Sequence, residues 1–250
     1  MDTMPASTSW HLLIPVKGGP RAKSRLKAPD GVDHGSLATA LALDTVSAAA
    51  AEVTAQRIVV VTSDPGIAGR VTAAGIHVVP DPGSGLNAAI LAGLGDLRRR
   101  RPDGPTGVLL GDLPAVRPVD LGAALDAASQ HQRSFVPDTE DSGTVLLTGS
   151  TPSVLQPHFG VGSAAAHERA GYARLDLDLP HLRTDVDDEE SLRAVLCLGV
   201  GVHTARLLAN LMATDSRQVH DRGREPQRRT GSAQNGCAAT GRSTAAPNPE

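Results

Sequence analysis

Four positively charged side chains lie close together near the start of the chain, in the segment Lys17-Gly-Gly-Pro-Arg21-Ala-Lys23-Ser-Arg25. Glycines let backbone amides approach a phosphate group, and Lys and Arg side chains neutralise its charge. The segment lacks the Gly-Lys-Ser/Thr ending of a P-loop and the spaced glycines of a Rossmann fold. It therefore predicts a phosphate-binding loop of another kind, although a solvated basic surface loop would have the same composition.

Two acidic segments are candidates for binding a metal ion. Asp112 directly follows the apolar run at residues 107–110, and a carboxylate in such a place is costly unless it has a partner. Mg²⁺ is a suitable partner, because proteins usually bind it through one or two carboxylates and phosphate oxygens. The alternation Asp185-Val186-Asp187 puts two carboxylates on one side of an extended segment. Asp187, with Asp185 as the alternative, is thus a second candidate ligand, while a turn cap is the other interpretation of Asp112.

Two further segments combine glycines with a polar residue at a predicted helix start. Asn87 follows a glycine-containing turn, and Ser163 follows Gly160 in another. The amides at a helix N-terminus favour anions, so both places are candidates for binding a phosphate or a carboxylate. Ordinary helix capping is the alternative for each. His167 and Arg169, on the helix after Ser163, are expected to add positive charge.

The elements that would position these residues are short apolar strands alternating with helices. Strands are predicted at residues 10–16, 57–62, 76–79, 107–110, 134–136, 144–147 and 173–177. Helices are predicted at residues 36–53, 65–74, 86–99, 118–129, 189–198 and 202–211. This alternation predicts an α/β fold with a mostly parallel sheet. The pattern loosens after residue 137, which indicates an antiparallel excursion and hence a mixed sheet.

Ligands of open α/β sheets bind beyond the carboxyl ends of the strands. In this sequence that rule indicates four places: the loop after Val16, Asp64, residues 83–87 and residues 111–112. The basic loop, one glycine-containing turn and Asp112 are all among them, so a single site at one edge of the sheet is expected.

Composition narrows the class of protein. The chain has 250 residues and a net charge of −3, which suits one sizeable domain and argues against a general nucleic-acid binder. Two cysteines, Cys197 and Cys237, argue against a disulfide framework or a structural zinc site. The sequence contains no apolar run of the roughly 20 residues that span a bilayer and no signal peptide pattern. We expect a cytoplasmic protein that binds neither membranes nor nucleic acids.

The last part of the chain has a different composition. Residues 212–250 are rich in Arg, Gln, Ser, Thr, Gly and Pro and lack apolar periodicity. Such a segment cannot bury enough surface to offset the entropy of ordering. We therefore predict a folded domain at residues 1–211 and a disordered polar tail at residues 212–250.

Taken in order, the motifs resemble the 2-phospho-L-lactate and phosphoenolpyruvate guanylyltransferases of coenzyme F-420 biosynthesis. The resemblance covers residues 10–210. The segments that carry it are Ile14-Pro-Val-Lys17, Ala22-Lys-Ser-Arg25-Leu26, Leu86-Asn87, Gly111-Asp-Leu-Pro114, Gly143-Thr144, Phe159-Gly160 with Ser163 and His167, Asp185-Val-Asp187 and Leu198-Gly-Val-Gly201.

The resemblance implies a nucleotidyltransferase fold of the glycosyltransferase-A type, a mixed and mostly parallel sheet flanked by helices. It also implies transfer of GMP from GTP to phosphoenolpyruvate or 2-phospho-L-lactate, with release of pyrophosphate. Residue roles are carried over by position. The resemblance implies catalysis by Asp112, Lys17 and Lys23, and Mg²⁺ binding by Asp112 and Asp187. It implies nucleotide binding by Lys17, Lys23, Arg25 and Asn87, and acceptor binding by Thr144, Gly160 and Ser163.

Two other functions are kept as alternatives. One is a nucleotidyltransferase for a sugar phosphate or a molybdenum-cofactor precursor, whose Leu-Ala-Gly-Gly opening differs from Ile14-Pro-Val-Lys17 in this chain. The other is a nucleotide-binding protein without catalysis. The residue patterns do not choose between the two acceptors, and both a monomer and a homodimer fit them.

Overall fold

The structure is a computed structural model that describes residues 9–17, 26 and 28–209. The chain divides into two units, Met1–Ala213 and Thr214–Glu250, and every described residue belongs to the first. The predicted polar tail lies outside the described residues and stays a prediction.

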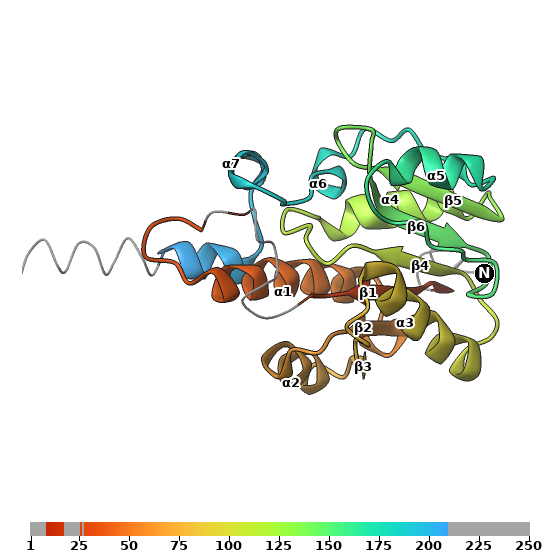
Figure 1. The fold of residues 1–250 in the computed structure, drawn as a ribbon, viewed down its shortest axis with the longest axis horizontal. Helices are drawn as coiled ribbons and strands as arrows, with labels where there is room; N and C mark the ends of the chain where they lie inside the picture. The colour runs from red at the N-terminus through yellow and green to blue at the C-terminus, as the bar shows by residue number, and fades with distance from the viewer. Residues whose placement is uncertain (1–8, 18–25, 27, 210–250) are drawn as a thin grey trace, which may run out of the picture. The chain divides into compact units, whose positions relative to one another are not determined.

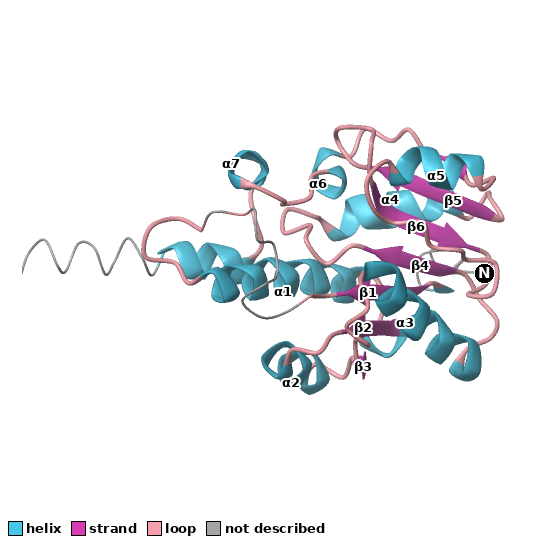
Figure 2. Cartoon of the chain, in the orientation of Figure 1, coloured by secondary structure: helices cyan, strands magenta, loops and turns pink. Residues whose placement is uncertain are grey.

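Within the described part of the chain, seven strands form one sheet in the order β3-β2-β1-β4-β6-β5-β7 (Figures 1 and 2). The strands are β1 (His11–Pro15), β2 (Ile58–Val61), β3 (His77–Val79), β4 (Thr106–Leu109), β5 (Arg133–Pro137), β6 (Thr144–Gly149) and β7 (Ala173–Arg174). β3, β2, β1 and β4 are parallel, whereas β6 is antiparallel to both β4 and β5. The predicted mixed, mostly parallel sheet is confirmed, and β6 is its antiparallel strand.

Helices connect the strands and cover the sheet. They are α1 (His34–Glu52), η2 (Ala55–Arg57), α2 (Pro65–Ala73), α3 (Leu86–Arg100), α4 (Pro118–Ala128), α5 (Ser163–Arg169), α6 (Pro180–Arg183), α7 (Glu189–Leu198) and Val202–Ala209. No single helix among the described residues is long and apolar enough to cross a membrane, although the pair Glu189–Leu198 and Val202–Ala209, bent by 107°, passes on length and composition.

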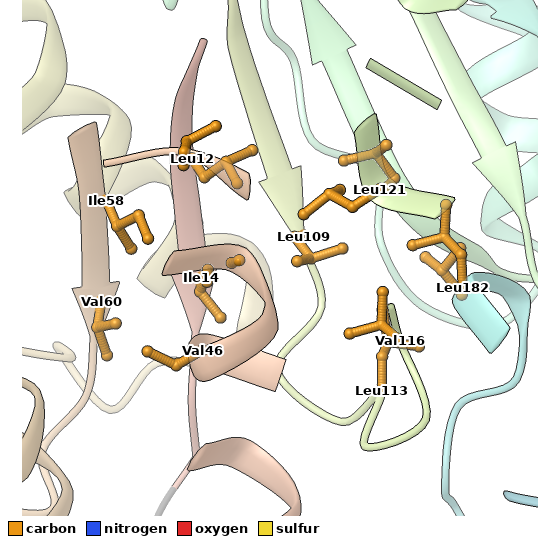
Figure 3. Close-up of a cluster of buried hydrophobic side chains, with 14 of the residues drawn as sticks. Leu12, Ile14, Val46, Ile58, Val60, Leu109, Leu113, Val116, Leu121 and Leu182 are labelled. Carbon is orange, nitrogen blue, oxygen red and sulfur yellow. The ribbon is translucent and has the colours of Figure 1, made fainter. Parts of the chain in front are cut away.

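The side chains of each central strand alternate between two cores, because successive residues of a strand point to opposite faces. Leu12 and Ile14 of β1 pack in one core with α1, α2 and α4. Figure 3 shows this core, with Val46 of α1 beside the strands and Leu121 of α4 near Leu109. Leu13 belongs to the second core, which α3 and the segment around α5 complete.

Most predicted elements occur within two residues of their expected bounds. The strand expected at 173–177 is shorter, since β7 ends at Arg174. After it the chain makes tight turns, with the Leu177 amide bonded to the Leu175 carbonyl and the Leu179 amide to the Leu177 carbonyl. Such bonds between residues two apart replace the ladder of a continuing strand.

Candidate active site

A cavity of about 360 Å³ lies at the carboxyl ends of the central parallel strands. Fourteen residues line it: Pro15, Val16, Lys17, Ala38, Ala42, Asp81, Gly83, Gly85, Leu86, Ala89, Leu110, Gly111, Asp112 and Asp187. The cavity therefore joins the start of the basic loop, the turn before α3 and the segment after β4. These are three of the four places that the strand-end rule indicated.

Three carboxylates meet at this cavity. Ligand atoms of Asp112, Asp185 and Asp187 all lie within 4.8 Å of one another. Asp112 and Asp185 are half-buried and Asp187 is exposed. The predicted alternation explains the pair, because the intervening Val186 is fully buried in a third apolar cluster while its neighbours turn toward Asp112. The group can hold a divalent cation, and it includes both alternatives considered for the second ligand.

The segment that carries Asp112 is fixed on three sides. The Asp112 carbonyl accepts from the Val186 amide at 3.1 Å, which ties the two acidic segments together. The Pro114 carbonyl accepts from the Gly201 amide at 3.0 Å. A Cβ at Gly111 would lie 2.7 Å from the Pro15 carbonyl oxygen. Only a glycine thus allows the ends of β1 and β4 to approach this closely.

The acidic segment is fixed by the start of α7. The Asp188 side chain accepts from the Ser191 amide at 2.9 Å, and the Ser191 hydroxyl accepts from the Asp187 and Asp188 amides at 3.0 Å. This capping box satisfies backbone amides that the helix leaves without partners. It separates the roles of two adjacent carboxylates, since Asp188 caps the helix and Asp187 faces Asp112.

Of the basic loop at residues 17–25, only Lys17 belongs to the described residues. Lys17 is exposed and lines the cavity, whereas Lys23 and Arg25 lie outside the described residues and keep their predicted roles. The N-terminus of α3 lines the same cavity through Gly83, Gly85 and Leu86. Its unsatisfied amides favour an anion there.

Asp64, at the fourth strand end, does not join this cavity. Its side chain accepts from the amides of Gly66 and Ile67 at 2.8 and 2.9 Å and so caps α2. Asp64 is therefore the one of the four strand-end places that does not line this cavity. The reason is local, because Pro65 begins a helix whose free amides this carboxylate satisfies.

Asn87 lies in the first turn of α3 and is bonded to a distant loop. Its Nδ2 donates to the Phe159 carbonyl at 2.8 Å, and its Oδ1 accepts from the Phe159 amide at 2.9 Å. The side chain is not the cap of α3, because Gly85 is the N-cap. Direct nucleotide binding by Asn87 stays a prediction, while the observed contacts hold Phe159 against the first turn of α3.

The three residues expected to hold the acceptor converge from two directions. Thr144 begins β6, next to the end of β4, where the Leu110 amide donates to the Val145 carbonyl at 3.0 Å. Ser163 begins α5 after Gly160, and the Ala164 amide donates to the Ser142 carbonyl at 3.1 Å. The structure therefore brings the starts of β6 and α5 together, but Thr144, Gly160 and Ser163 do not line the cavity, and Thr144 and Ser163 are buried. Acceptor binding by these three residues stays a prediction.

His167 does not supply the positive charge expected of it. The side chain is fully buried, and burial, with a smaller contribution from the nearby His158, lowers its pKa from 6.5 to about 4. The imidazole is therefore neutral near pH 7, while Arg169 is exposed at the end of α5.

Several residues that fix the site carry no motif. Asp44, on the buried face of α1, accepts from the His203 and Thr204 amides at 2.8 and 2.9 Å and so caps the helix Val202–Ala209. Its signal in the sequence is a carboxylate within an apolar helical stretch, which requires a partner when buried. Arg183 donates to the Pro137 and Asp138 carbonyls at 3.1 and 2.7 Å, and nothing in the sequence indicates that contact.

Comparisons with known proteins agree with the geometry. Residues 36–169 match the MobA-like NTP transferase domain family. A phosphoenolpyruvate guanylyltransferase from Streptomyces scabiei is 45% identical over 211 residues, which cover 81% of this chain and 97% of that protein. Another protein of that name, from Streptosporangium roseum, is 42% identical over 215 residues, covering 84% of this chain and 96% of its own.

A solved structure shares the fold. It is a candidate nucleotide-diphospho-sugar transferase from Desulfovibrio desulfuricans G20, with a TM-score of 0.57 and 16% identity, covering 82% of this chain and 96% of its own. The nucleotidyltransferase fold expected from the motifs is confirmed. The chain belongs to the phosphoenolpyruvate guanylyltransferase family, within the MobA-like NTP transferases.

Proposed function

We propose that this protein transfers GMP from GTP to phosphoenolpyruvate and releases pyrophosphate, a step of coenzyme F-420 biosynthesis. The observation that carries the proposal is the group of three carboxylates at the cavity, with Lys17 and the N-terminus of α3 lining the same space. Relatives named phosphoenolpyruvate guanylyltransferase support the choice of acceptor. 2-Phospho-L-lactate is the alternative acceptor.

The donor set fits a hard divalent cation, for which we propose Mg²⁺. Asp112, Asp185 and Asp187 offer only carboxylate oxygens, the ligands that Mg²⁺ prefers, whereas zinc sites are rich in His and Cys. These three side chains would hold the ion, with Asp112 and Asp187 at the cavity wall. When bound, the cation neutralises phosphate oxygens and stabilises charge that develops on the leaving group.

The reaction forms one bond and breaks one bond at the α-phosphorus of GTP. A phosphate oxygen of the acceptor attacks the α-phosphorus, and the bond from that phosphorus to the bridging oxygen of the β-phosphate breaks, so that pyrophosphate leaves. The attacking phosphate is already ionised near neutral pH, and no side chain has to remove a proton. The protein therefore contributes orientation and positive charge.

Each group of candidate residues has a proposed task. Lys17 and the α3 N-terminus, together with Lys23 and Arg25 from the basic loop, bind the triphosphate. Thr144, Gly160 and Ser163 bind the carboxylate of the acceptor. Because both substrates are small phosphorylated metabolites, we place the reaction in the cytoplasm. Homodimer formation and the lack of nucleic-acid binding stay predictions.

Pyrophosphate release from GTP, Mg²⁺ and phosphoenolpyruvate tests the proposal. We expect release with phosphoenolpyruvate, and a product mass equal to the acceptor plus GMP. ATP and CTP as donors, and 2-phospho-L-lactate and phosphoglycerate as competing acceptors, define the specificity. No release with any of the three acceptors would refute the function.

A matched pair of variants tests the role of the site. Asp112→Asn should abolish turnover while the circular dichroism spectrum is kept. Asp126→Asn, on the exposed side of α4, removes one carboxylate away from the cavity and should leave turnover unchanged. Equal activity of Asp112→Asn and the parent would refute the role of Asp112.

A further inference from the structure

A buried histidine contacts Thr144, one of the residues predicted to bind the acceptor. His167 is fully buried, and the rings of Phe135, Phe159 and Tyr172 surround it with centroid distances of 5.9, 5.2 and 5.5 Å. The whole chain has only two Phe, one Tyr and one Trp, so three of its four aromatic residues surround this one imidazole. The cage excludes water, and a polar group in such a place needs internal partners.

Both ring nitrogens have such partners. The His158 amide lies 3.0 Å from Nε2 and the Thr144 hydroxyl lies 2.9 Å from Nδ1. A backbone N–H can only donate, so Nε2 must be the acceptor and carry no proton. A neutral imidazole has one proton, which must then be on Nδ1 and be donated to the Thr144 oxygen. The low pKa of His167, caused by burial, agrees with a neutral ring.

This tautomer fixes the direction of the Thr144 hydroxyl. Its oxygen accepts from Nδ1, so its own proton cannot point at His167 and must be donated elsewhere. Among the described contacts, the hydroxyl has no other hydrogen-bond partner. Its proton is left for another acceptor, which we take to be the acceptor substrate that Thr144, Gly160 and Ser163 are predicted to bind.

The same imidazole holds the loop that carries Gly160. Residues 155–159 form no regular secondary structure, yet side chains of α3, of α5 and of the turn before β7 bond to the loop backbone. Tyr172 bonds to Gln156, accepting from its amide at 2.7 Å. His167 accepts from the His158 amide, and Asn87 bonds to both backbone groups of Phe159. An irregular loop is thereby held in one conformation.

We propose that His167 is a positioning residue with two roles. Its Nδ1–H makes the Thr144 hydroxyl a hydrogen-bond donor toward the carboxylate of the acceptor. Its Nε2 holds the loop before Gly160. This inference rests on the proposed function for the identity of the ligand, but the tautomer is a property of the protein alone. A histidine that only fills the core would have the same tautomer, so the effect of His167 on acceptor binding is what separates the two roles.

Nuclear magnetic resonance tests the tautomer without any substrate. A long-range ¹H–¹⁵N spectrum at pH 7 should show one histidine with its proton on Nδ1, and that signal should disappear in His167→Gln. A charged ring, or a proton on Nε2, would overturn the proposal whatever the enzyme does.

The kinetics of two His167 variants separate the roles of the two ring nitrogens. An Asn amide reaches the place of Nδ1, whereas a Gln amide reaches the place of Nε2. His167→Asn should therefore keep the bond to Thr144, and His167→Gln should keep the bond to the His158 amide. We expect His167→Gln to raise the KM for phosphoenolpyruvate about tenfold, as for losing a hydrogen bond to a charged group, with the KM for GTP unchanged.

A double-mutant cycle decides whether His167 acts through Thr144. Thr144→Val, which removes the hydroxyl, should raise the same KM, and His167→Gln should then add little in that background. Additive effects of the two substitutions, or a change in the KM for GTP instead, would overturn the inference about His167. The proposed function would still stand in that case, because the parent enzyme turns over. Absence of turnover in the parent would refute the function and leave the tautomer result standing. Circular dichroism spectra confirm that each variant is folded.

Discussion

The Leu113 amide donates a 3.0 Å hydrogen bond to the Thr45 hydroxyl, and that hydroxyl donates in turn to the Leu41 carbonyl at 3.2 Å. Thr45 is fully buried on α1, and Leu113 is the residue after Asp112. The hydroxyl is therefore both the acceptor that the segment after β4 needs and a donor to its own helix. One buried side chain, distant from Asp112 in the sequence, thus fixes the position at which the segment with Asp112 leaves the sheet.

Replacing Thr45 with Val should destabilise the protein and weaken the site. The two side chains have the same shape, but Val leaves the buried Leu113 amide without an acceptor, which costs about 1–3 kcal/mol. Urea unfolding should show that loss, and turnover with GTP and phosphoenolpyruvate should fall. Thr45→Ser is the control, because it keeps the hydroxyl. Equal stability of the Val and Ser variants would contradict this role for the hydroxyl.

Two adjacent carboxylates should respond differently to loss of charge. Asp187→Asn should lower the affinity for Mn²⁺, measured by calorimetry, because Asp187 belongs to the group with Asp112 and Asp185. Asp188→Asn should leave that affinity and the thermal stability nearly unchanged, since Asn caps a helix about as well as Asp and Asp188 serves only as the α7 cap. The same loss of affinity in both variants would show that net charge, and not position, attracts the cation.

β1 and β4 approach each other closely at Gly111, and a side chain at this position should disturb the site. Gly111→Ala places a Cβ 2.7 Å from the Pro15 carbonyl oxygen and 2.9 Å from Val16 Cγ2, so the backbone must shift at a cost of roughly 1–3 kcal/mol. Turnover should fall with stability, because the shift moves Asp112. Gly69→Ala is the matched control.

Gly69 lies inside α2 and has nothing within 4 Å of an added Cβ. Ala at this position should raise stability by roughly 0.5–1 kcal/mol, through helix propensity alone. Thermal unfolding of both variants compares the two effects directly. If Gly111→Ala proved as stable and as active as Gly69→Ala, the close approach of β1 and β4 would not constrain the site.

The strands of the fold and the acidic pair of the site could be predicted from the sequence, because the patterns that indicate them are local. The apolar run at Ile58–Val61 indicates a strand buried on both faces, and β2 spans those residues. The pair Asp185 and Asp187 follows from strand alternation, with Val186 buried between them. Each of these inferences needs only a few neighbouring residues.

The contacts that hold the site together are of another kind. Thr45 meets Leu113 across 68 positions, and Asn87 meets Phe159 across 72. Helix capping is the alternative interpretation of Asn87 in the sequence, and only the tertiary arrangement shows that its side chain bonds to Phe159 instead. The positive charge expected of His167 is wrong for the same reason, because burial decides its protonation and burial is a property of the folded chain.

The lowered pKa of His167 predicts that the protein loses stability in mild acid. The pKa is about 4 in the folded state, against the ordinary histidine value of 6.5 that applies to the unfolded chain. Between these values the unfolded state binds more protons, so the free energy of unfolding rises with pH. The stabilisation is complete above pH 6.5 and disappears as the pH falls toward 4. Its size is at most about 3 kcal/mol, since one pKa unit corresponds to about 1.36 kcal/mol.

Urea unfolding at several pH values between 4.5 and 7.5 measures this slope. Other groups add to it with the same sign, because burial and the nearby Arg57 also lower the pKa of His11. The difference between the parent and His167→Gln isolates one imidazole, since Gln does not titrate and His11 is present in both. The parent should lose more stability than the variant on going from pH 7 to pH 4.5. Parallel curves would mean that His167 is accessible to protons in the folded protein, and that its two hydrogen bonds do not fix a neutral ring.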